Sequence, residues 1–256
     1  MSRISDAFSD GTAFIGFVTG GDPSFNASQD FILTLANSGA RIVEIGIPFS
    51  DPIAEGTVIQ DANLRALAAG ATTDDIFDLV ASVRAESDVA LVLLTYLNPV
   101  LHYGYQEFFS RAAQVGVDGI IIPDLPFEEH GELRDITRAA GIDLISMIAP
   151  TSSERIASVC EQAYGFIYLV SSMGVTGVRS EIQTDLAGMV AAVRAHTDLP
   201  VAIGFGISTS EQASDIAQYA DGVIVGSAIV RIIAEHGENA SGYLAEYAGS
   251  MVSAIM

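Results

Sequence analysis

Eight short apolar runs recur along the chain, and each is followed by an Ala-rich amphipathic segment. Near-continuous apolar runs of this length are typical of strands in a parallel sheet whose two faces are both covered. The predicted strands span residues 13–18, 42–45, 90–96, 119–122, 143–147, 166–170, 201–203 and 222–225. No other feature restricts the choice of fold as strongly.

Helices are predicted over residues 27–36, 73–86, 105–115, 128–140, 153–162, 182–195, 210–217, 228–234 and 240–254, with a short amphipathic helix over 1–8. Eight β/α units of about thirty residues predict an α/β fold, a single (β/α)8 TIM barrel with a short extra N-terminal helix. We expect one domain over residues 1–256. An open doubly wound sheet ranks second, because no glycine-rich dinucleotide turn follows the first strand.

The net charge of −21 reflects a scarcity of bases, since 32 acidic residues accompany 11 arginines and no lysine. Such a chain repels polyanions, so we expect no nucleic acid and no membrane among its partners. The absence of lysine excludes imine aldolases and lysine-anchored pyridoxal phosphate. It also removes the lysine of a phosphate-loop nucleotide site.

Further features concern compartment and metals. No apolar run reaches the length of a membrane span, and the N-terminus lacks the apolar core of a signal peptide. The lone Cys160 cannot form an internal disulfide, which fits a reducing cytoplasm. The four histidines lack metal-ligand spacing, so we expect no metal site.

Polar and glycine-rich residues gather after the C-terminal ends of the predicted strands, where a barrel carries its active site. Among them, Glu44 ends the second strand. Ile42 and Glu44 share a face of that strand, and an apolar barrel interior would raise the pKa of the carboxyl into the range useful for proton transfer. Glu44 is therefore the candidate catalytic acid/base. A salt bridge to an arginine at the barrel rim is a nearly equal alternative.

Glu55 lies in a Pro- and Gly-rich loop eleven residues after Glu44. Taken alone, it is best interpreted as a solvated loop acid. Its proximity to Glu44 makes it the second candidate for catalysis.

An anion site is predicted on the loops after the sixth, seventh and eighth strands, at Gly177, Gly206, Gly226 and Ser227. Barrels commonly bind phosphate there, at the N-terminus of a short helix, and glycines let backbone N–H groups approach an anion. Ser227 could cap the helix predicted from Ala228. Each glycine alone would be an ordinary turn residue.

Three further polar residues are candidates near the site. Tyr168 has the spacing to point inward beside Glu44, although buried barrel tyrosines are more often packing residues. Tyr96 and Asp124 are interpreted as groups that hold the residues of the site in position.

The chain resembles the tryptophan synthase alpha subunit family along nearly its whole length. The most specific match is the run Glu-Ile-Gly-Ile-Pro-Phe-Ser-Asp-Pro that begins at Glu44, together with the Gly-Val-Thr-Gly that ends at Gly177. Further matching segments are residues 17–23, 53–60, 94–99, 119–126, 168–171, 204–208 and 226–230.

The resemblance implies a barrel that cleaves indole-3-glycerol phosphate by a retro-aldol reaction. It implies that Glu44 protonates indole C3 and relays the proton of the glycerol hydroxyl, while Glu55 steadies the positive charge at the indole N–H. The implied substrate-binding residues are Phe17, Tyr96, Asp124, Tyr168, Thr176, Gly177, Phe205, Gly206, Gly226 and Ser227. The loop over residues 172–185 would act as a lid.

The family's partner is a beta subunit that carries pyridoxal phosphate, so we expect no cofactor in this chain and a heterotetramer with contacts near Pro48, Asp51 and Asn98. One departure from the family is Glu55, where Asp is usual. The alternatives are a free-standing indole-releasing lyase, a catalytically weak subunit that mainly activates a beta subunit, and another phosphosugar barrel.

Overall fold

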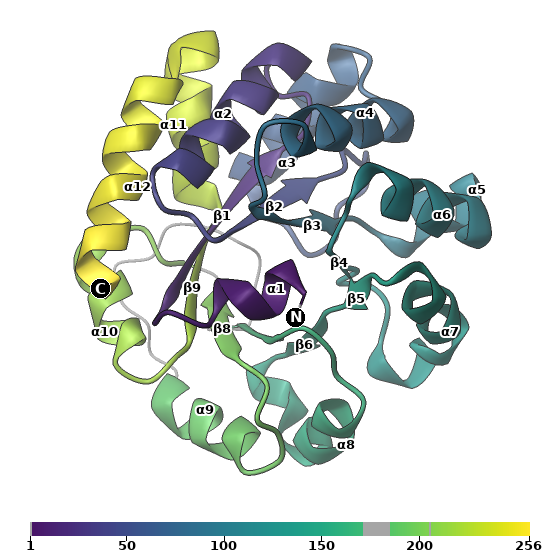
Figure 1. Cartoon of the computed structure of the whole chain (residues 1–256), viewed down its shortest axis with the longest axis vertical. Coiled ribbons are helices and arrows are strands. Elements are labelled where there is room, and N and C mark those ends of the chain that lie inside the picture. Colours follow the sequence, from purple (N-terminus) through teal and green to yellow (C-terminus); the bar gives the residue numbers. More distant parts are fainter. Residues whose placement is uncertain (1, 171–184, 205) are drawn as a thin grey trace.

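The computed structural model describes residues 2–170, 185–204 and 206–256. A single parallel sheet lies at the centre, and helices surround it (Figure 1). The strand order is β5-β4-β3-β2-β1-β9-β8-β7-β6. The strands are β1 Ala13–Thr19, β2 Ile42–Gly46, β3 Ala90–Leu94, β4 Gly119–Ile121, β5 Asp143–Leu144, β6 Ser146–Ile148, β7 Ile167–Val170, β8 Val201–Gly204 and β9 Gly222–Val225.

The two ends of this sheet meet in one segment of the chain. Only Ile145 separates β5 from β6; β5 pairs with β4, and β6 pairs with β7. The N–H of Ile145 donates to the carbonyl of Ile120 at 2.9 Å. Residues 143–148 therefore close the sheet into a barrel. This confirms the predicted TIM barrel, in which the fifth predicted strand is divided into two.

The helices lie outside the barrel, except for α1, which lies across one of its ends (Figure 1). They are α1 Arg3–Ala7, α2 Phe25–Asn37, α3 Thr57–Ala68, α4 Thr73–Arg84, α5 Leu97–Tyr103, α6 Tyr105–Val115, α7 Gly131–Ala140, α8 Ile156–Glu161, α9 Leu186–Arg194, α10 Ser210–Ala217, α11 Ser227–His236 and α12 Ser241–Ile255, with short 3-10 turns at Phe127–Glu129, Pro150–Arg155 and Gly237–Asn239. The part of the predicted sixth helix over residues 182–184 lies outside the described residues.

Two helices were not predicted, α3 and α5. The residue before α3 is Gly56, which offers no side-chain cap, so the usual sequence signal for a helix start is missing. In α5, Pro99 occupies the first turn, where its missing N–H removes no helical hydrogen bond. The third strand ends at Leu94, earlier than predicted, because α5 begins at Leu97 and Tyr96 is the residue before it.

Alternate strand residues fill the barrel, as the two-residue period of a strand requires. Ile15, Ile42, Val92 and Ile224 form an inner cluster with Ile4 of α1. A second and larger cluster lies between the strands and the outer helices. Because Glu44 follows Ile42 by two residues, the same alternation directs its side chain inward.

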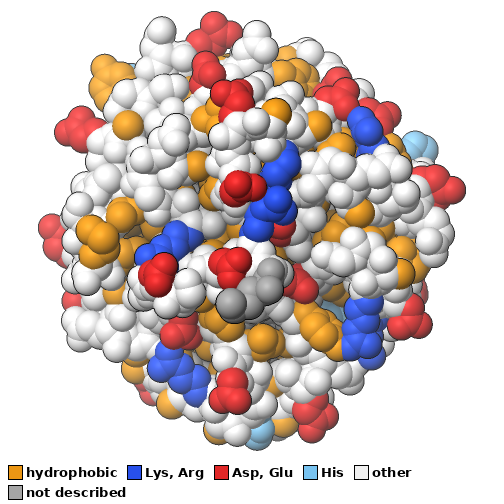
Figure 2. Space-filling model, viewed as in Figure 1, with side chains coloured by type: hydrophobic (Ala, Val, Ile, Leu, Met, Phe, Trp, Pro, Cys, Tyr) orange, Lys and Arg blue, Asp and Glu red, His pale blue; other side chains and the backbone are white. Residues whose placement is uncertain are grey.

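The surface on the α1 side is mixed but contains more acidic than basic side chains (Figure 2). None of the helices in the described ranges combines the length and apolar character that a membrane crossing requires.

Ile4→Ala tests whether α1 closes the end of the barrel. Ile4 is fully buried, so its truncation should lower the free energy of unfolding by about 3 kcal/mol. The matched control is Ile53→Ala, because Ile53 is 74% exposed and should change stability by less than about 0.5 kcal/mol. Urea unfolding of both variants measures the difference. Equal effects would contradict the packing of α1 against the barrel.

Candidate active site

Glu44 is a fully desolvated carboxyl in the middle of β2. It is 1% exposed, between Phe17 on β1 and Val92 on β3 in the sheet register. Within the described residues, its Oε1 atom has no hydrogen-bond partner, and no ion pair includes this side chain. None of the described arginines forms the rim salt bridge considered from the sequence, and Arg41 donates instead to the backbone carbonyls of Ala7 and Asp10. Burial raises the pKa of the Glu44 carboxyl to about 8.

Glu55 is buried as well, so its interpretation as a solvated loop acid is wrong. The side-chain amide of Asn63 donates to Glu55 Oε2 at 2.7 Å, and the Tyr96 hydroxyl donates to the same carboxyl. Burial raises the pKa of Glu55 to about 7, and the two hydrogen bonds oppose this rise because they favour the charged form.

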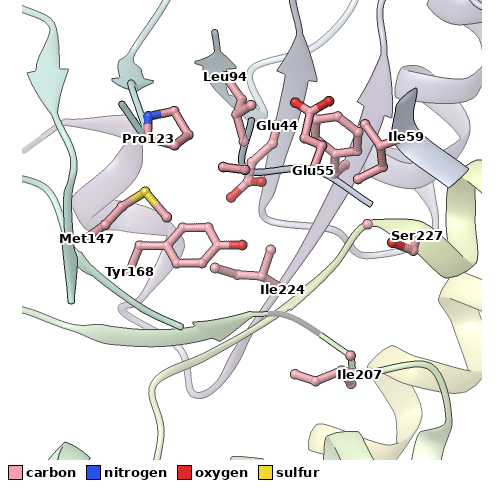
Figure 3. A pocket seen from close by; sticks show the side chains of 14 residues that line it. Glu44, Glu55, Ile59, Leu94, Pro123, Met147, Tyr168, Ile207, Ile224 and Ser227 are labelled. Carbon is pink, nitrogen blue, oxygen red and sulfur yellow. The ribbon is translucent and has the colours of Figure 1, made fainter. Parts of the chain in front are cut away.

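A cavity joins the two carboxyls (Figure 3). Its walls are mainly apolar, as in most small-molecule sites. The lining residues are Phe17, Glu44, Ala54, Glu55, Ile59, Leu94, Pro123, Met147, Tyr168, Gly206, Ile207, Ile224, Gly226 and Ser227. The structure thus brings together seven of the predicted residues: Phe17, Glu44, Glu55, Tyr168, Gly206, Gly226 and Ser227.

Tyr168 lies directly across from Glu44, whose carboxyl points toward it (Figure 3). Burial, followed by the nearby Glu44 charge, raises the pKa of the Tyr168 phenol, so this group is neutral at ordinary pH. A Cβ at Gly204 would collide with the Tyr168 hydroxyl, so glycine at this position leaves room for the ring. Gly46 does the same for the ring of Phe17.

Tyr96 and Asp124 support the site without lining the cavity. The Tyr96 hydroxyl accepts from the N–H of Ala54 at 3.0 Å, while it donates to Glu55. Asp124 accepts from the N–H of Leu97 at 2.9 Å, at the start of α5. Tyr96 therefore holds the loop that carries Glu55, and Asp124 holds the start of α5 next to Tyr96.

The end of the cavity at the start of α11 is lined by Gly206, Gly226 and Ser227, where an anion site was predicted. Gly226 precedes α11 and Ser227 is its first residue, so the predicted capping of a helix from Ala228 by Ser227 is wrong. The N-terminus of α11 has no side-chain cap, which leaves its first N–H groups available to an anion. Gly206 has a φ of +85°, a conformation that favours glycine.

The remaining predicted residues, Thr176, Gly177 and Phe205, lie outside the described residues, as does the predicted lid except for Asp185. Within the ranges that are described, no group of three or more His, Cys, Asp or Glu side chains could hold a metal ion.

The sequence analysis missed Asn63 and the apolar wall formed by Ile59, Leu94, Pro123 and Met147. A signal was available for Leu94 and Met147, because both continue the inward alternation of their strands. Asn63 and Ile59 belong to α3, which was not predicted as a helix.

Comparison with known proteins decides the family. A family model described as "Tryptophan synthase alpha chain" matches residues 5–254. This chain belongs to the tryptophan synthase alpha chain family. The Lactiplantibacillus plantarum alpha chain is 50% identical over 256 residues, which cover 100% of this chain and 97% of the relative. The Lacticaseibacillus casei alpha chain is 49% identical over 240 residues, 94% of this chain and 90% of the relative.

Solved structures of the tryptophan synthase family share the fold. A structure of Mycobacterium tuberculosis tryptophan synthase has a TM-score of 0.90 and 36% identity, and the match covers 99% of this chain and 98% of that one. A structure of the Pyrococcus furiosus tryptophan synthase α2β2 complex has a TM-score of 0.89 and 37% identity, with coverage of 94% and 98%.

Glu44→Gln should stabilise this chain at neutral pH. The Glu44 pKa rises from 4.5 to about 8 on folding, so wild-type stability falls as the pH rises through this interval. Glutamine carries no charge, and the variant should gain on the order of 3 kcal/mol in the free energy of unfolding at pH 7. At about pH 4 this gain should vanish. Urea unfolding at both pH values measures it, and a pH-independent difference would contradict the buried carboxyl.

Proposed function

We propose that Glu44 and Glu55 are the catalytic pair of this chain. As a tryptophan synthase alpha chain, the protein is a carbon–carbon lyase of tryptophan biosynthesis that cleaves indole-3-glycerol phosphate to indole and glyceraldehyde 3-phosphate. The observation that carries the proposal is the placement of two buried carboxyls on one apolar cavity with an amide-built anion end.

The reaction begins with proton transfer from Glu44. With a pKa of about 8 its carboxyl is mainly protonated at pH 7, so it can donate to indole C3. Protonated C3 turns the ring into an electron sink. The Glu44 carboxylate then accepts the proton of the adjacent glycerol hydroxyl, the bond between C3 and this carbinol carbon breaks, and its electron pair returns to the ring. Indole and an aldehyde result, and Glu44 ends protonated as it began.

Glu55 acts at the other end of the ring. Positive charge develops at the indole nitrogen when C3 is protonated, and an ionised Glu55 would accept a hydrogen bond from this N–H and stabilise the charge. Phe17, Leu94 and Met147 supply an apolar wall for the indole. Tyr168 lines the site beside Glu44.

The phosphate is assigned to Gly206, Gly226 and Ser227, together with Gly177. The N-terminus of α11 and the Ser227 hydroxyl supply donors in a chain that has no lysine. Thr176 and Phe205 are assigned to substrate binding by the family resemblance. We also assign residues 1–256 to one barrel domain in the cytoplasm.

The partner is a beta subunit that holds the pyridoxal phosphate. The Pyrococcus furiosus neighbours include a tryptophan synthase complex and an α2β2 complex. In this chain Asp51 and Asn98 are exposed, while Pro48 is buried. Ile53 and Leu101 add exposed apolar surface on the same loop and on α5. Cleavage assays with and without a beta subunit separate a coupled subunit from a free-standing lyase.

Glu44→Gln should abolish cleavage. Incubating the purified chain with indole-3-glycerol phosphate and measuring the release of indole tests the function directly. Loss of the proton donor should lower kcat by at least about 1000-fold. Glu161→Gln is the matched control, because it makes the same change on an exposed residue of α8. Wild-type turnover in Glu44→Gln would refute its role.

Glu55→Ala belongs in the same assay series. It should lower kcat/KM by about 100-fold, because the developing charge loses its stabilising carboxylate. If cleavage is weak in the wild type but the chain still stimulates a beta subunit, the weak-subunit alternative is favoured.

The pH dependence of kcat/KM should be bell-shaped. Activity needs Glu55 ionised, which sets a rising limb near pH 7, and Glu44 protonated, which sets a falling limb near pH 8. Initial rates between about pH 5 and 10 measure both limbs. Because Glu55→Ala removes the first group, it should abolish the rising limb and keep the falling one. A profile that is flat across this range would contradict the assignment of both groups.

A further inference from the structure

Asn63 is a buried residue of α3 whose side chain is directed at a catalytic candidate. It is 4% exposed, and its Nδ2 donates to Glu55 Oε2 at 2.7 Å. One turn earlier on the same helix, Gln60 Nε2 donates to the backbone carbonyl of Glu55 at 2.8 Å. The helix therefore holds both the main chain and the carboxylate of Glu55, through separate side chains.

The helix is itself anchored to the barrel. Arg65, two residues after Asn63, donates from Nε and from an Nη atom to the two oxygens of Asp22, each at 2.8 Å. Asp22 is 2% exposed and follows β1. A bidentate pair of this kind fixes orientation as well as distance. Asn63 thus presents its amide from a fixed position relative to β1.

The length of the Glu55 side chain makes this position significant. Asp is usual here in the family, and Glu adds one methylene, roughly 1.5 Å of reach and one more rotatable bond. Misplacement of a reacting group by about 1 Å can cost on the order of 100-fold in rate. The longer side chain therefore needs a contact that fixes the position of its carboxylate.

We propose that Asn63 is a positioning residue of the lyase reaction. Its amide holds the Glu55 carboxylate where that group can accept a hydrogen bond from the indole N–H. The same hydrogen bond favours the ionised form of the carboxylate. This inference rests on the proposed function of Glu55. It assigns Asn63 a role through Glu55 and no contact with the reacting atoms.

Among the described residues, the titratable group that bonds to Glu55 is Tyr96, which directly precedes α5 and donates a second hydrogen bond to the carboxyl. Glu44 and Tyr168 line the same cavity from β2 and β7. Burial raises the pKa of Glu55, and the hydrogen bond from Asn63 is the larger of the two opposing contributions. Removing this donor should therefore move the ionisation of Glu55 to higher pH.

The test is the pH profile of kcat/KM for Asn63→Ala and Asn63→Asp. Asn63→Ala should lower kcat/KM by about 10-fold at pH 7 and shift the rising limb upward, while the falling limb of Glu44 stays in place. Asn63→Asp replaces the donor with a second carboxylate, so its rising limb should lie higher still. A uniform loss with both limbs unmoved would overturn the proposal, because it is the result expected of a purely structural residue.

A matched control is Gln60→Ala, on the same helix and next to the same residue. The side chain of Gln60 donates to the backbone carbonyl of Glu55 and not to its carboxylate, so its loss should lower the rate without moving the rising limb. Thermal unfolding of each variant confirms that it is folded. A shifted limb in Gln60→Ala equal to that in Asn63→Ala would also overturn the specific role of Asn63.

A double-mutant cycle with Glu55→Asp tests whether the role of Asn63 depends on the length of the side chain at position 55. An Asp carboxylate at position 55 is too short to meet Asn63 where Glu55 does, so Asn63→Ala should cost about 10-fold in the wild type and less than about 2-fold in the Glu55→Asp background. Equal costs would contradict the proposal. If Glu55→Ala is fully active, the proposed function fails; if it is inactive while Asn63→Ala leaves the limbs unmoved, only the role of Asn63 fails.

Discussion

The desolvation of Glu44 is the condition on which the rest of the site depends. A carboxylate in an apolar interior is costly, and here Oε1 has no hydrogen-bond partner among the described residues. The fold tolerates the residue because the carboxyl can remain protonated, with a pKa of about 8. The same feature that opposes stability at high pH therefore supplies a proton donor at neutral pH. A salt bridge to an arginine would have lowered the cost of burying the charged carboxylate. It would also have lowered the pKa, so that Glu44 would carry no proton at neutral pH.

Glu55 shows how a second carboxyl in the same cavity acquires a different ionisation state. Both groups are buried, but Glu55 receives donors from Asn63 and Tyr96, and its pKa is about 7. Near neutral pH the two acids are thus separated into a mainly protonated and a substantially ionised group, which is the division that a proton donor and a charge stabiliser need. The hydrogen bonds that favour the ionised Glu55 come from helix α3 and from the residue before α5, so both elements contribute to the proposed chemistry.

The barrel and the inward orientation of Glu44 could be predicted from the sequence, because both follow from the alternation of side chains along a strand. Strand periodicity placed Ile42 and Glu44 on one face, and the register confirms that this face is internal. The environment of Glu55 could not be predicted in this way. Asn63 reaches Glu55 only because residues 57–68 are helical, and Gly56 gives no capping signal for that helix. The ion pair of Asp22 with Arg65 joins residues 43 positions apart, and no sequence pattern around either residue predicts the other as its partner.

The scarcity of basic side chains leaves backbone N–H groups as the main donors at the proposed anion site. Among the described arginines, six are already held in ion pairs with carboxylates: Arg3, Arg65, Arg84, Arg111, Arg155 and Arg194. A phosphorylated substrate approaching a chain of net charge −21 meets a field that repels it. The donors at the start of α11 act only within about a helical turn, where they are not paired with any side-chain cap. In the proposed function, binding at this end therefore depends on close contact with backbone N–H groups and with the Ser227 hydroxyl. With the phosphate at the proposed site, its position and the reach of Glu44 to indole C3 would both be set by the backbone at the start of α11.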